Sequence, residues 1–297
     1  MKVVDPHIHL WDLGRLHYPW LTDLPSTGVY GDNTPIRKNY LLDSLLQESS
    51  TFTIDKVVHV EAAVDSGEQL LETEWLQAIA DEPASSGRPN GIVVACDLDA
   101  ADVGDTLDQH LQSANVRGVR QILNTSNDPR LSFIDVELMQ RDSWVEGFGE
   151  LGTRGLSFDL QIYPHQMRDA AALARRFPDT QLILNHTGMP HDLDSAYFAE
   201  WRWAMETLTA CPNVSVKISG LGMMFHDWTV ETIRPFVLET IASFGANRAM
   251  FASNFPVDGM YSSYDVLWEA YVDIVRDFSD DDRTSLFHDT AERIYQL

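Results

Sequence analysis

The sequence has few cysteines, few basic residues and no long apolar run. Its 297 residues include only Cys96 and Cys211, which form no CxxC pair, so we expect neither a disulfide framework nor a thiolate zinc site. Lys and Arg number 21 against 45 Asp and Glu, a formal net charge of −24. This excess of acid argues against nucleic-acid and anionic-membrane partners, which need a basic surface. No apolar run approaches the roughly 18 residues that span a bilayer, and no signal-peptide pattern opens the chain, so we expect a soluble, cytoplasmic protein.

Short β-rich runs alternate with amphipathic stretches along the whole chain. We predict strands at 2–8, 56–62, 91–96, 118–123, 156–162, 181–185, 214–219 and 249–253, and helices at 68–79, 103–113, 170–177, 197–210, 230–244 and 263–276. This alternation predicts an α/β fold with a parallel sheet, and eight strands close a (β/α)8 TIM barrel, here a single domain over residues 1–297. The alternative is a doubly wound open sheet. Its dinucleotide-binding form is disfavoured because no Gly-x-Gly-x-x-Gly turn follows the first strand.

Three irregular segments, 13–35, 124–133 and 220–228, are predicted to be loops above the carboxyl ends of the strands. They carry apolar side chains that could roof a pocket: Tyr18, Trp20, Met223, Met224, Phe225 and Trp228. We expect Tyr18 and Trp20 to bind substrate. The alternative is that these side chains only hold the loops in place.

The segment from Asp5 to His9 carries the strongest chemical pattern. Because side chains alternate along a strand, His7 and His9 point to one side and Ile8 to the other. Two imidazoles at the carboxyl end of a first barrel strand can hold a metal ion or transfer protons. The alternative, two packed histidines without a chemical role, is disfavoured by their place at the end of the first of eight strands.

Polar side chains also stand at the ends of five further predicted strands, whose interiors are otherwise Val, Ile and Leu. They are Glu61, Arg120, Asp159 with Gln161, His186, and Ser253 with Asn254, and the seventh strand adds Lys217 and Ser219. Their shared position predicts one polar mouth. We expect Arg120, Glu61 and Lys217 to bind substrate. For Arg120 the alternative is an ion pair with an acidic loop.

With these residues the chain resembles the amidohydrolase superfamily, in particular its lactonases. That branch includes sugar-acid lactonases of the fucono- and rhamnonolactonase kind and the pyrone- and muconolactone-type hydrolases of aromatic degradation. The resemblance covers nearly the whole chain and rests on DPHIHLWD (5–12), YPWL (18–21), RGVR (117–120), LNHTG (184–188), VKISGL (216–221), MFASNFPVD (250–258) and FHDTAERIY (287–295).

The resemblance implies a (β/α)8 barrel in which His7, His9 and His186 match the family's histidines and Arg120 matches its fourth-strand arginine. Many relatives have aspartate where this chain has Asn254, and that aspartate often binds metal and deprotonates the attacking water. A carboxamide is a poor base and a weak metal ligand. Strand five offers no clear histidine, and strand four ends without the lysine that some relatives carbamylate for a binuclear site.

The resemblance implies a hydrolase that opens a lactone ring, most simply a sugar-acid lactone, with an activated water. His7, His9 and His186 could hold one divalent ion, zinc or manganese. Alternatively, the histidines and Arg120 polarise the carbonyl without a metal, and Asn254 orients the water. The general base is then His9, His186, Asp159 or Asp258, so we count Asp159 and Asn254 with the histidines as catalytic candidates.

Two other functions stay open. One is a decarboxylase or hydratase of the same superfamily that acts on a small carboxylic acid, and the other is a catalytically inactive barrel that only binds a ligand. In each case the expected partner is a small molecule, not a nucleic acid or a membrane, and a homo-oligomer is possible.

Overall fold

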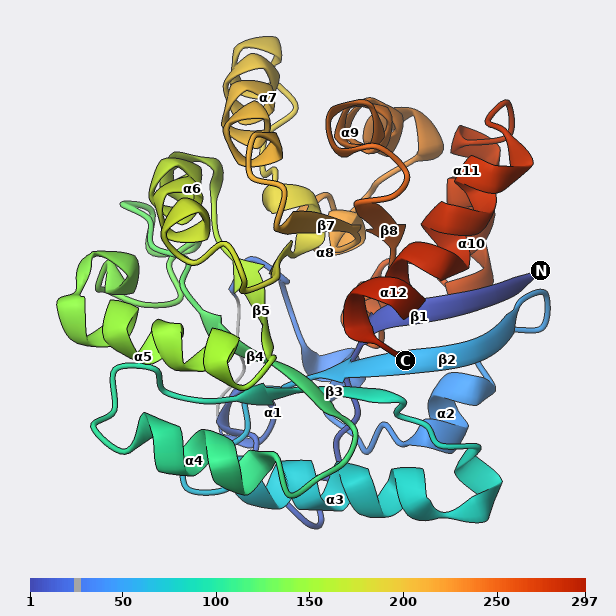
Figure 1. The fold of residues 1–297 in the computed structure, drawn as a ribbon. Helices are drawn as coiled ribbons and strands as arrows, with labels where there is room; N and C mark the ends of the chain where they lie inside the picture. Colours follow the sequence, from blue (N-terminus) through green and yellow to red (C-terminus); the bar gives the residue numbers. More distant parts are fainter. Residues whose placement is uncertain (24–27) are drawn as a thin grey trace.

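The protein is a parallel barrel in a computed structural model that describes residues 1–23 and 28–297. Eight strands form one sheet in chain order, and each pairs in parallel with the next (Figure 1). They are β1 (Lys2–Ile8), β2 (Thr53–Val60), β3 (Gly91–Ala95), β4 (Val116–Ile122), β5 (Ser157–Gln161), β6 (Leu182–Leu184), β7 (Val214–Ile218) and β8 (Ala249–Phe251). The predicted (β/α)8 architecture is therefore confirmed.

The segment that follows β8 closes the barrel against β1. The Asn254 N–H donates to the His7 carbonyl at 2.9 Å, and the His9 N–H donates to the Phe255 carbonyl at 2.8 Å. An isolated parallel bridge joins Ile8 to Phe255 at the same place. Barrel closure and the site are thus made by the same few residues.

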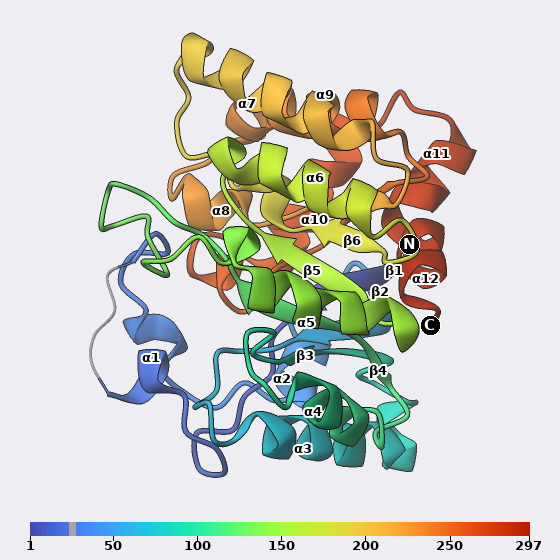
Figure 2. The ribbon, with the colours of Figure 1, turned by 60° about the vertical axis from the view of Figure 1, so that its left-hand side comes forward.

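Helices surround the sheet and connect successive strands. They are α1 (Pro19–Thr22), α2 (Leu42–Leu46), α3 (Gln69–Asp81), α4 (Val103–His110), α5 (Asp142–Thr153), α6 (Met167–Arg176), α7 (Ser195–Thr209), α8 (Leu221–Met224), α9 (Val230–Phe244), α10 (Tyr264–Ile274), α11 (Asp280–Thr284) and α12 (Thr290–Tyr295). The short α1 and α8 interrupt two of the predicted loops, and they lie on the side toward which the β5 arrow points (Figure 2). This is the side where barrel enzymes carry their sites.

The sequence analysis did not predict α5. Its interior contains Gly147, Gly149 and Gly152, which lower helix propensity and obscure the apolar periodicity. Packing explains Gly147, because a Cβ atom there would lie 2.0 Å from the Leu98 carbonyl oxygen. The backbone of α5 therefore packs directly against the backbone at Leu98. The inner face of the helix buries Trp144 and other side chains.

The barrel interior is apolar at its amino-terminal end. Val4, Val58, Val60, Val93, Ile183 and Met250 form a buried cluster there with Ala291, Ile294 and Tyr295 of α12. The last helix thus covers the end of the barrel opposite the loops, and barrel enzymes carry their sites at the other, carboxyl end.

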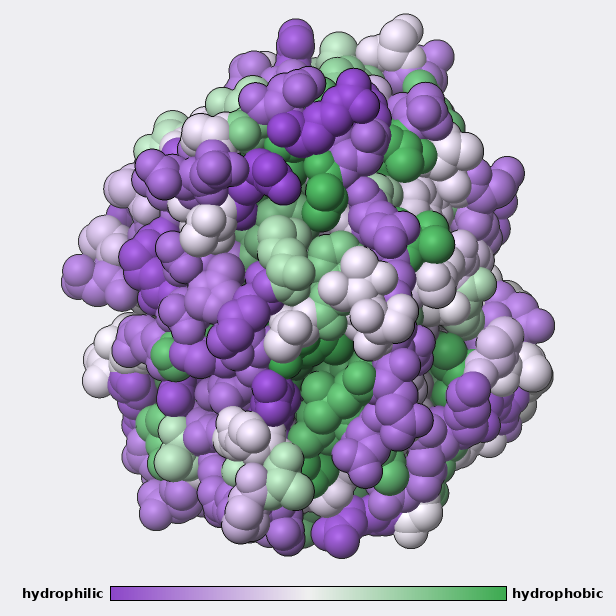
Figure 3. Space-filling view, turned by 90° about the vertical axis from the view of Figure 1, so that its right-hand side faces the viewer, coloured by the Kyte–Doolittle hydropathy of each residue, from purple (hydrophilic) through white to green (hydrophobic). Residues whose placement is uncertain are grey.

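One face of the outer surface is mainly hydrophilic (Figure 3). On the face that carries α10 and α11, purple residues predominate, and the apolar ones gather in a narrow band (Figure 3). Among the described residues, no helix has the length and apolar character needed to cross a membrane.

A buried carboxyl group lies behind the first loop. Glu72 of α3 is 2% exposed, and its Oε1 is 3.9 Å from His59 Nε2. Burial and then the Glu61 carboxylate raise the pKa of Glu72 to about 8, and the neighbouring Tyr18 hydroxyl opposes part of this shift. Folding therefore favours the protonated form of Glu72.

Replacing this carboxyl should change how stability depends on pH. Between the ordinary pKa of 4.5 and the folded value of about 8, the folded protein holds a proton on Glu72 that the unfolded chain has lost, so stability falls as pH rises. We expect Glu72→Gln to remove this dependence of stability on pH. Its unfolding free energy, relative to wild type, should then increase by about 1.4 kcal/mol per pH unit from pH ~5 to ~8.

Urea unfolding of both proteins across that range measures the slope. Glu74→Gln, at an exposed position on the same helix, is the matched control and should give a flat difference. Equal slopes for the two variants would contradict the protonated state of Glu72.

Candidate active site

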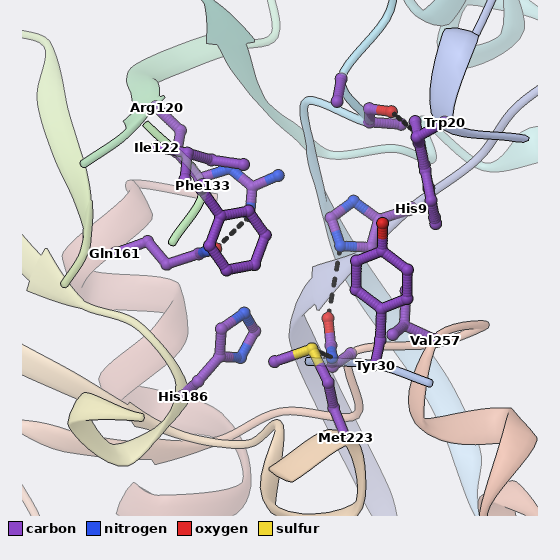
Figure 4. A pocket seen from close by; sticks show the side chains of 13 residues that line it. His9, Trp20, Tyr30, Arg120, Ile122, Phe133, Gln161, His186, Met223 and Val257 are labelled. Carbon is purple, nitrogen blue, oxygen red and sulfur yellow. Dashed lines mark hydrogen bonds between the residues drawn. The ribbon is translucent and has the colours of Figure 1, made fainter. Parts of the chain in front are cut away.

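A pocket opens at the carboxyl ends of the strands. Its volume is about 620 Å³, part of it open to solvent at the mouth. It is lined by His9, Trp20, Tyr30, Ala62, Ala63, Arg120, Ile122, Phe133, Gln161, His186, Met223, Asn254 and Val257 (Figure 4). Apolar and aromatic side chains make most of the wall, and a few polar groups converge from β4, β5 and the segments after β1, β6 and β8.

His9 presents one ring nitrogen to this pocket. Its Nδ1 lies 2.8 Å from the Val60 carbonyl oxygen, which only accepts hydrogen bonds, so the proton of the neutral ring is on Nδ1. Nε2 then carries a lone pair and lies 3.3 Å from Oδ1 of the Asn254 carboxamide. The amide can present its N–H₂ or its carbonyl there, since both fit the same outline.

His186 faces His9 across the pocket (Figure 4). Its Nδ1 lies 3.1 Å from Ser219 Oγ, and its backbone has a φ of 53°, which turns the side chain inward. The ring packs on Gly220, where a Cβ atom would lie 2.6 Å from His186 Nδ1. Gly220 therefore leaves the space that the imidazole occupies.

His7 lies below these two histidines and does not line the pocket. Its ring centroid is 4.5 Å from that of His186 and 5.0 Å from that of His9. The side chain is fully buried, Nδ1 lies 3.2 Å from Lys217 Nζ, and Nε2 has no hydrogen-bond partner among the described residues.

All three histidines are held neutral. Burial lowers the pKa of each of them, and the positive charges of Lys217 and Arg120 add to the effect. For His9 the pKa falls to about 3. The rings therefore act as neutral donors and acceptors at pH 7.

Arg120 reaches the pocket as half of a buried ion pair. Its Nε donates to Glu61 Oε1 at 2.6 Å, one terminal nitrogen donates to the Glu61 carbonyl at 2.6 Å, and the other donates to Gln161 Oε1 at 3.0 Å. Both charged side chains are about 5% exposed. Glu61 therefore balances the charge of Arg120, and it does not line the pocket itself.

Lys217 and Asp159 meet each other deeper in the barrel. Both are completely buried and form an ion pair, and the Tyr295 hydroxyl contacts both carboxylate oxygens of Asp159 at 3.0 and 2.9 Å. Neither lines the pocket, although both were predicted to touch substrate or reacting atoms.

Asn254 occupies the strand-eight position at the pocket wall, with a φ of 58°. Asp258 lies behind it, fully buried, with Oδ1 accepting from the Met223 N–H at 2.6 Å. Burial raises the pKa of Asp258 to about 7, and the Met223 N–H and the Asn254 side chain oppose the shift. The Asp258 carboxyl therefore does not line the pocket.

The roof differs in part from the prediction. Trp20 and Met223 line the pocket, but Tyr18 is buried beside Glu72, and Met224, Phe225 and Trp228 lie elsewhere. The prediction missed five apolar lining residues outside the first loop, Ala62, Ala63, Ile122, Phe133 and Val257, and Tyr30 within it. Val257 stands in the MFASNFPVD motif and Ile122 in β4, but nothing in their residue type marks them for the pocket, and only the folded barrel brings the six together.

Comparison with known proteins shows the family to which the chain belongs. The family model described as Amidohydrolase matches residues 4–297. The chain belongs to the amidohydrolase family. This amidohydrolase is 48% identical to an uncharacterized protein of Sinorhizobium fredii, y4mH, over 100% of this chain and 99% of that one. It is 27% identical to an L-fucono-1,5-lactonase of Burkholderia multivorans, over 99% and 96% of the two chains.

A solved amidohydrolase structure from Burkholderia multivorans, with bound zinc, matches this fold with a TM-score of 0.83 at 24% identity and covers 100% of both chains. The resemblance to amidohydrolase lactonases that the motifs indicated is therefore confirmed, as is the barrel fold.

In this amidohydrolase the three histidines do not meet as a metal-ligand cluster. Among the described residues, the only group of three His, Cys, Asp or Glu with ligand atoms within 4.8 Å of one another is His288, Asp289 and Glu292, away from the pocket. A metal-binding imidazole ordinarily donates its second N–H to a carboxylate, carbonyl or water, whereas His7 Nδ1 faces an ammonium group. With a carboxamide at Asn254 as well, the donor set does not fit a preformed metal site.

Gly220 gives a test of how His186 is positioned. A methyl group there would collide with the imidazole, in addition to the strain of a φ of +66°. Gly155 has the same φ of +66°, and a methyl group added there would meet nothing within 4 Å, so Gly155→Ala is a control for backbone strain alone. We expect Gly155→Ala to cost about 1 kcal/mol of stability, and Gly220→Ala to cost about 1–3 kcal/mol more.

Denaturant unfolding of both variants measures the difference. Equal losses would show that His186 moves freely and that Gly220 does not define its place.

Proposed function

We propose that this amidohydrolase opens the ring of an uncharged lactone with water, through its own side chains. The observation that carries the proposal is a largely apolar pocket in which two neutral imidazoles face each other beside a charge-balanced arginine. The 27% identity to an L-fucono-1,5-lactonase, over nearly the whole of both chains, supports the reaction class.

His9 is the proposed general base. Its Nε2 lone pair is directed at the pocket because the Val60 carbonyl holds the proton on Nδ1. A water next to the Asn254 carboxamide would attack the lactone carbonyl carbon and pass one proton to His9 Nε2. Asn254 acts here by orienting the water, since an amide cannot take the proton.

Arg120 and His186 are proposed to stabilise the oxyanion that forms. The contacts of Arg120 with Glu61 and Gln161 use three of the five guanidinium N–H groups, which leaves two for a substrate oxygen. The ring C–O bond then breaks, its electron pair stays on the ring oxygen, and that oxygen takes the proton from His9. Burial lowers the pKa of His9 to about 3, which makes the neutral ring a weak base for the first transfer and its protonated form a strong acid for this last one.

The charge of the pocket favours an uncharged substrate. Arg120 is the cation among the described lining residues, and Glu61 already neutralises it. The whole protein carries a formal net charge of −24, which repels anions at long range. A lactone with carboxylate substituents therefore lacks a free cationic partner here. The aromatic walls of Trp20, Tyr30 and Phe133 suit the apolar face of a sugar ring.

A substrate panel tests the reaction. Full-length protein, stripped with a chelator, should release acid from neutral sugar-acid lactones and should act far more slowly on pyrone or muconolactone acids. Activity that disappears with the chelator and returns with zinc or manganese would contradict a reaction carried by side chains alone. Carbon dioxide release from an aromatic acid without lactone hydrolysis would favour the decarboxylase alternative, and no turnover at all would favour a binding barrel.

Glu61 gives a test of the charge argument. Glu61→Gln keeps an acceptor for the Arg120 N–H groups but leaves the pocket with a net positive charge. The uncompensated charge of Arg120 should then attract the carboxylate of an anionic lactone. If this attraction contributes about 1.4 kcal/mol, the ratio of kcat/KM for an anionic lactone to that for a neutral one rises by about tenfold.

This ratio does not depend on how much of the variant is folded, so destabilisation cannot imitate the effect. Glu74→Gln, with the same change in total charge at an exposed position on α3, is the control. A ratio that rises equally in both variants would assign the effect to net charge and not to the pocket.

A further inference from the structure

A buried polar chain runs along the inside of the barrel, beneath the pocket. It begins at Tyr295 in α12 and continues through Asp159 and Lys217 to His7. All four side chains are at most 1% exposed. Such a chain is costly to bury unless each donor finds an acceptor, so its hydrogen-bond directions are tightly constrained.

The donor and acceptor of each hydrogen bond among these four side chains follow from their chemistry. Asp159 accepts from the Tyr295 hydroxyl and from the Lys217 ammonium group, so both of its oxygens have donors. The ammonium also lies 5.0 Å from the centre of the Tyr295 ring, a favourable cation–π position. A neutral Lys217 would leave the buried Asp159 carboxylate without a counter-charge.

The charged state of Lys217 is consistent with its surroundings. Its Nζ forms a fully buried ion pair with the Asp159 carboxylate, so the amine is held as an ammonium group. An ammonium group has three donors and no acceptor. The 3.2 Å contact between Lys217 Nζ and His7 Nδ1 therefore requires a lone pair on Nδ1.

We propose that Lys217 fixes His7 in the tautomer with its proton on Nε2, so that this histidine offers the site an N–H donor and no lone pair for a metal ion. A neutral imidazole has one proton, and Lys217 excludes it from Nδ1. His9 is held in the opposite way, because the Val60 carbonyl draws the proton to Nδ1 and frees Nε2. His7 at the end of β1 and His9 just after it thus have complementary roles.

The chemical consequence rests on the proposed function. His7 Nε2 is buried beside His186, without a partner among the described residues, and its N–H adds positive potential at the floor of the pocket. Lys217 is then a positioning residue that acts through His7. The tautomer itself does not depend on which reaction the protein catalyses.

Nitrogen NMR of the imidazoles tests the tautomer directly. In full-length protein labelled with ¹⁵N-histidine, the signal missing from a His7→Gln sample identifies His7, and its two-bond couplings show which nitrogen is protonated. We expect a protonated Nε2 and a bare Nδ1. A proton on Nδ1 would overturn the proposal, and this outcome is independent of any substrate.

Zinc affinity tests the control by Lys217. The double variant Lys217→Gln/Asp159→Asn removes both charges and gives His7 Nδ1 a carbonyl to donate to, which is the usual partner of a metal-binding histidine. We expect the His7 proton to move to Nδ1 and zinc to bind about 10- to 100-fold more tightly than to wild type, measured by competition with a fluorescent zinc indicator.

Lys217→Met/Asp159→Asn is the matched control, because it removes the same charges without supplying an oxygen acceptor. We expect its zinc affinity to lie below that of the Gln variant. Equal zinc affinities in all three proteins would overturn the proposal. If neither double variant folds, the nitrogen NMR spectrum of the wild-type protein decides alone. A wild-type protein that carries the His7 proton on Nε2 but has no lactonase activity would refute the proposed function and leave the tautomer proposal standing.

Discussion

Barrel closure is the constraint on which the site depends. Two backbone hydrogen bonds, from Asn254 to His7 and from His9 to Phe255, join the segment after β8 to the end of β1. They bring the His9 ring and the Asn254 carboxamide together, although the two residues stand near opposite ends of the sequence. Parallel strands all end at one rim, so each remaining strand adds its own side chains to the same mouth.

Two buried ion pairs inside the barrel also hold the site in place. Arg120 and Glu61 neutralise each other at the pocket wall, and Lys217 and Asp159 do so deeper in the barrel. Each pair is buried, so neither partner can move without leaving a charge unsatisfied. Burial keeps the rings neutral, and the positive charges that the pairs hold close to the histidines add to the effect, which determines the chemistry that the rings can perform.

The position of a residue at a strand end was a sound guide to the rim and a weaker guide to the pocket. It correctly selected four residues that line the pocket: His9, Arg120, His186 and Asn254. It also selected Lys217 and Asp159, which lie on strands that reach the rim but point inward below it. The alternation of side chains along a strand gives the direction of a residue, but its depth in the barrel depends on the stagger of neighbouring strands.

The sequence by itself determined the barrel, the family resemblance and the histidine pair, because the alternation of strands and helices and the local motifs are written along the chain. Only the tertiary structure decided what each residue can do. Tyr18 and Trp20 are two residues apart, yet one packs against Glu72 and the other lines the pocket. The likewise spaced His7 and His9 differ in the same way, since a lysine faces Nδ1 of one ring and a carbonyl faces Nδ1 of the other. Those partners come from other strands, and proton placement follows from such contacts rather than from residue type.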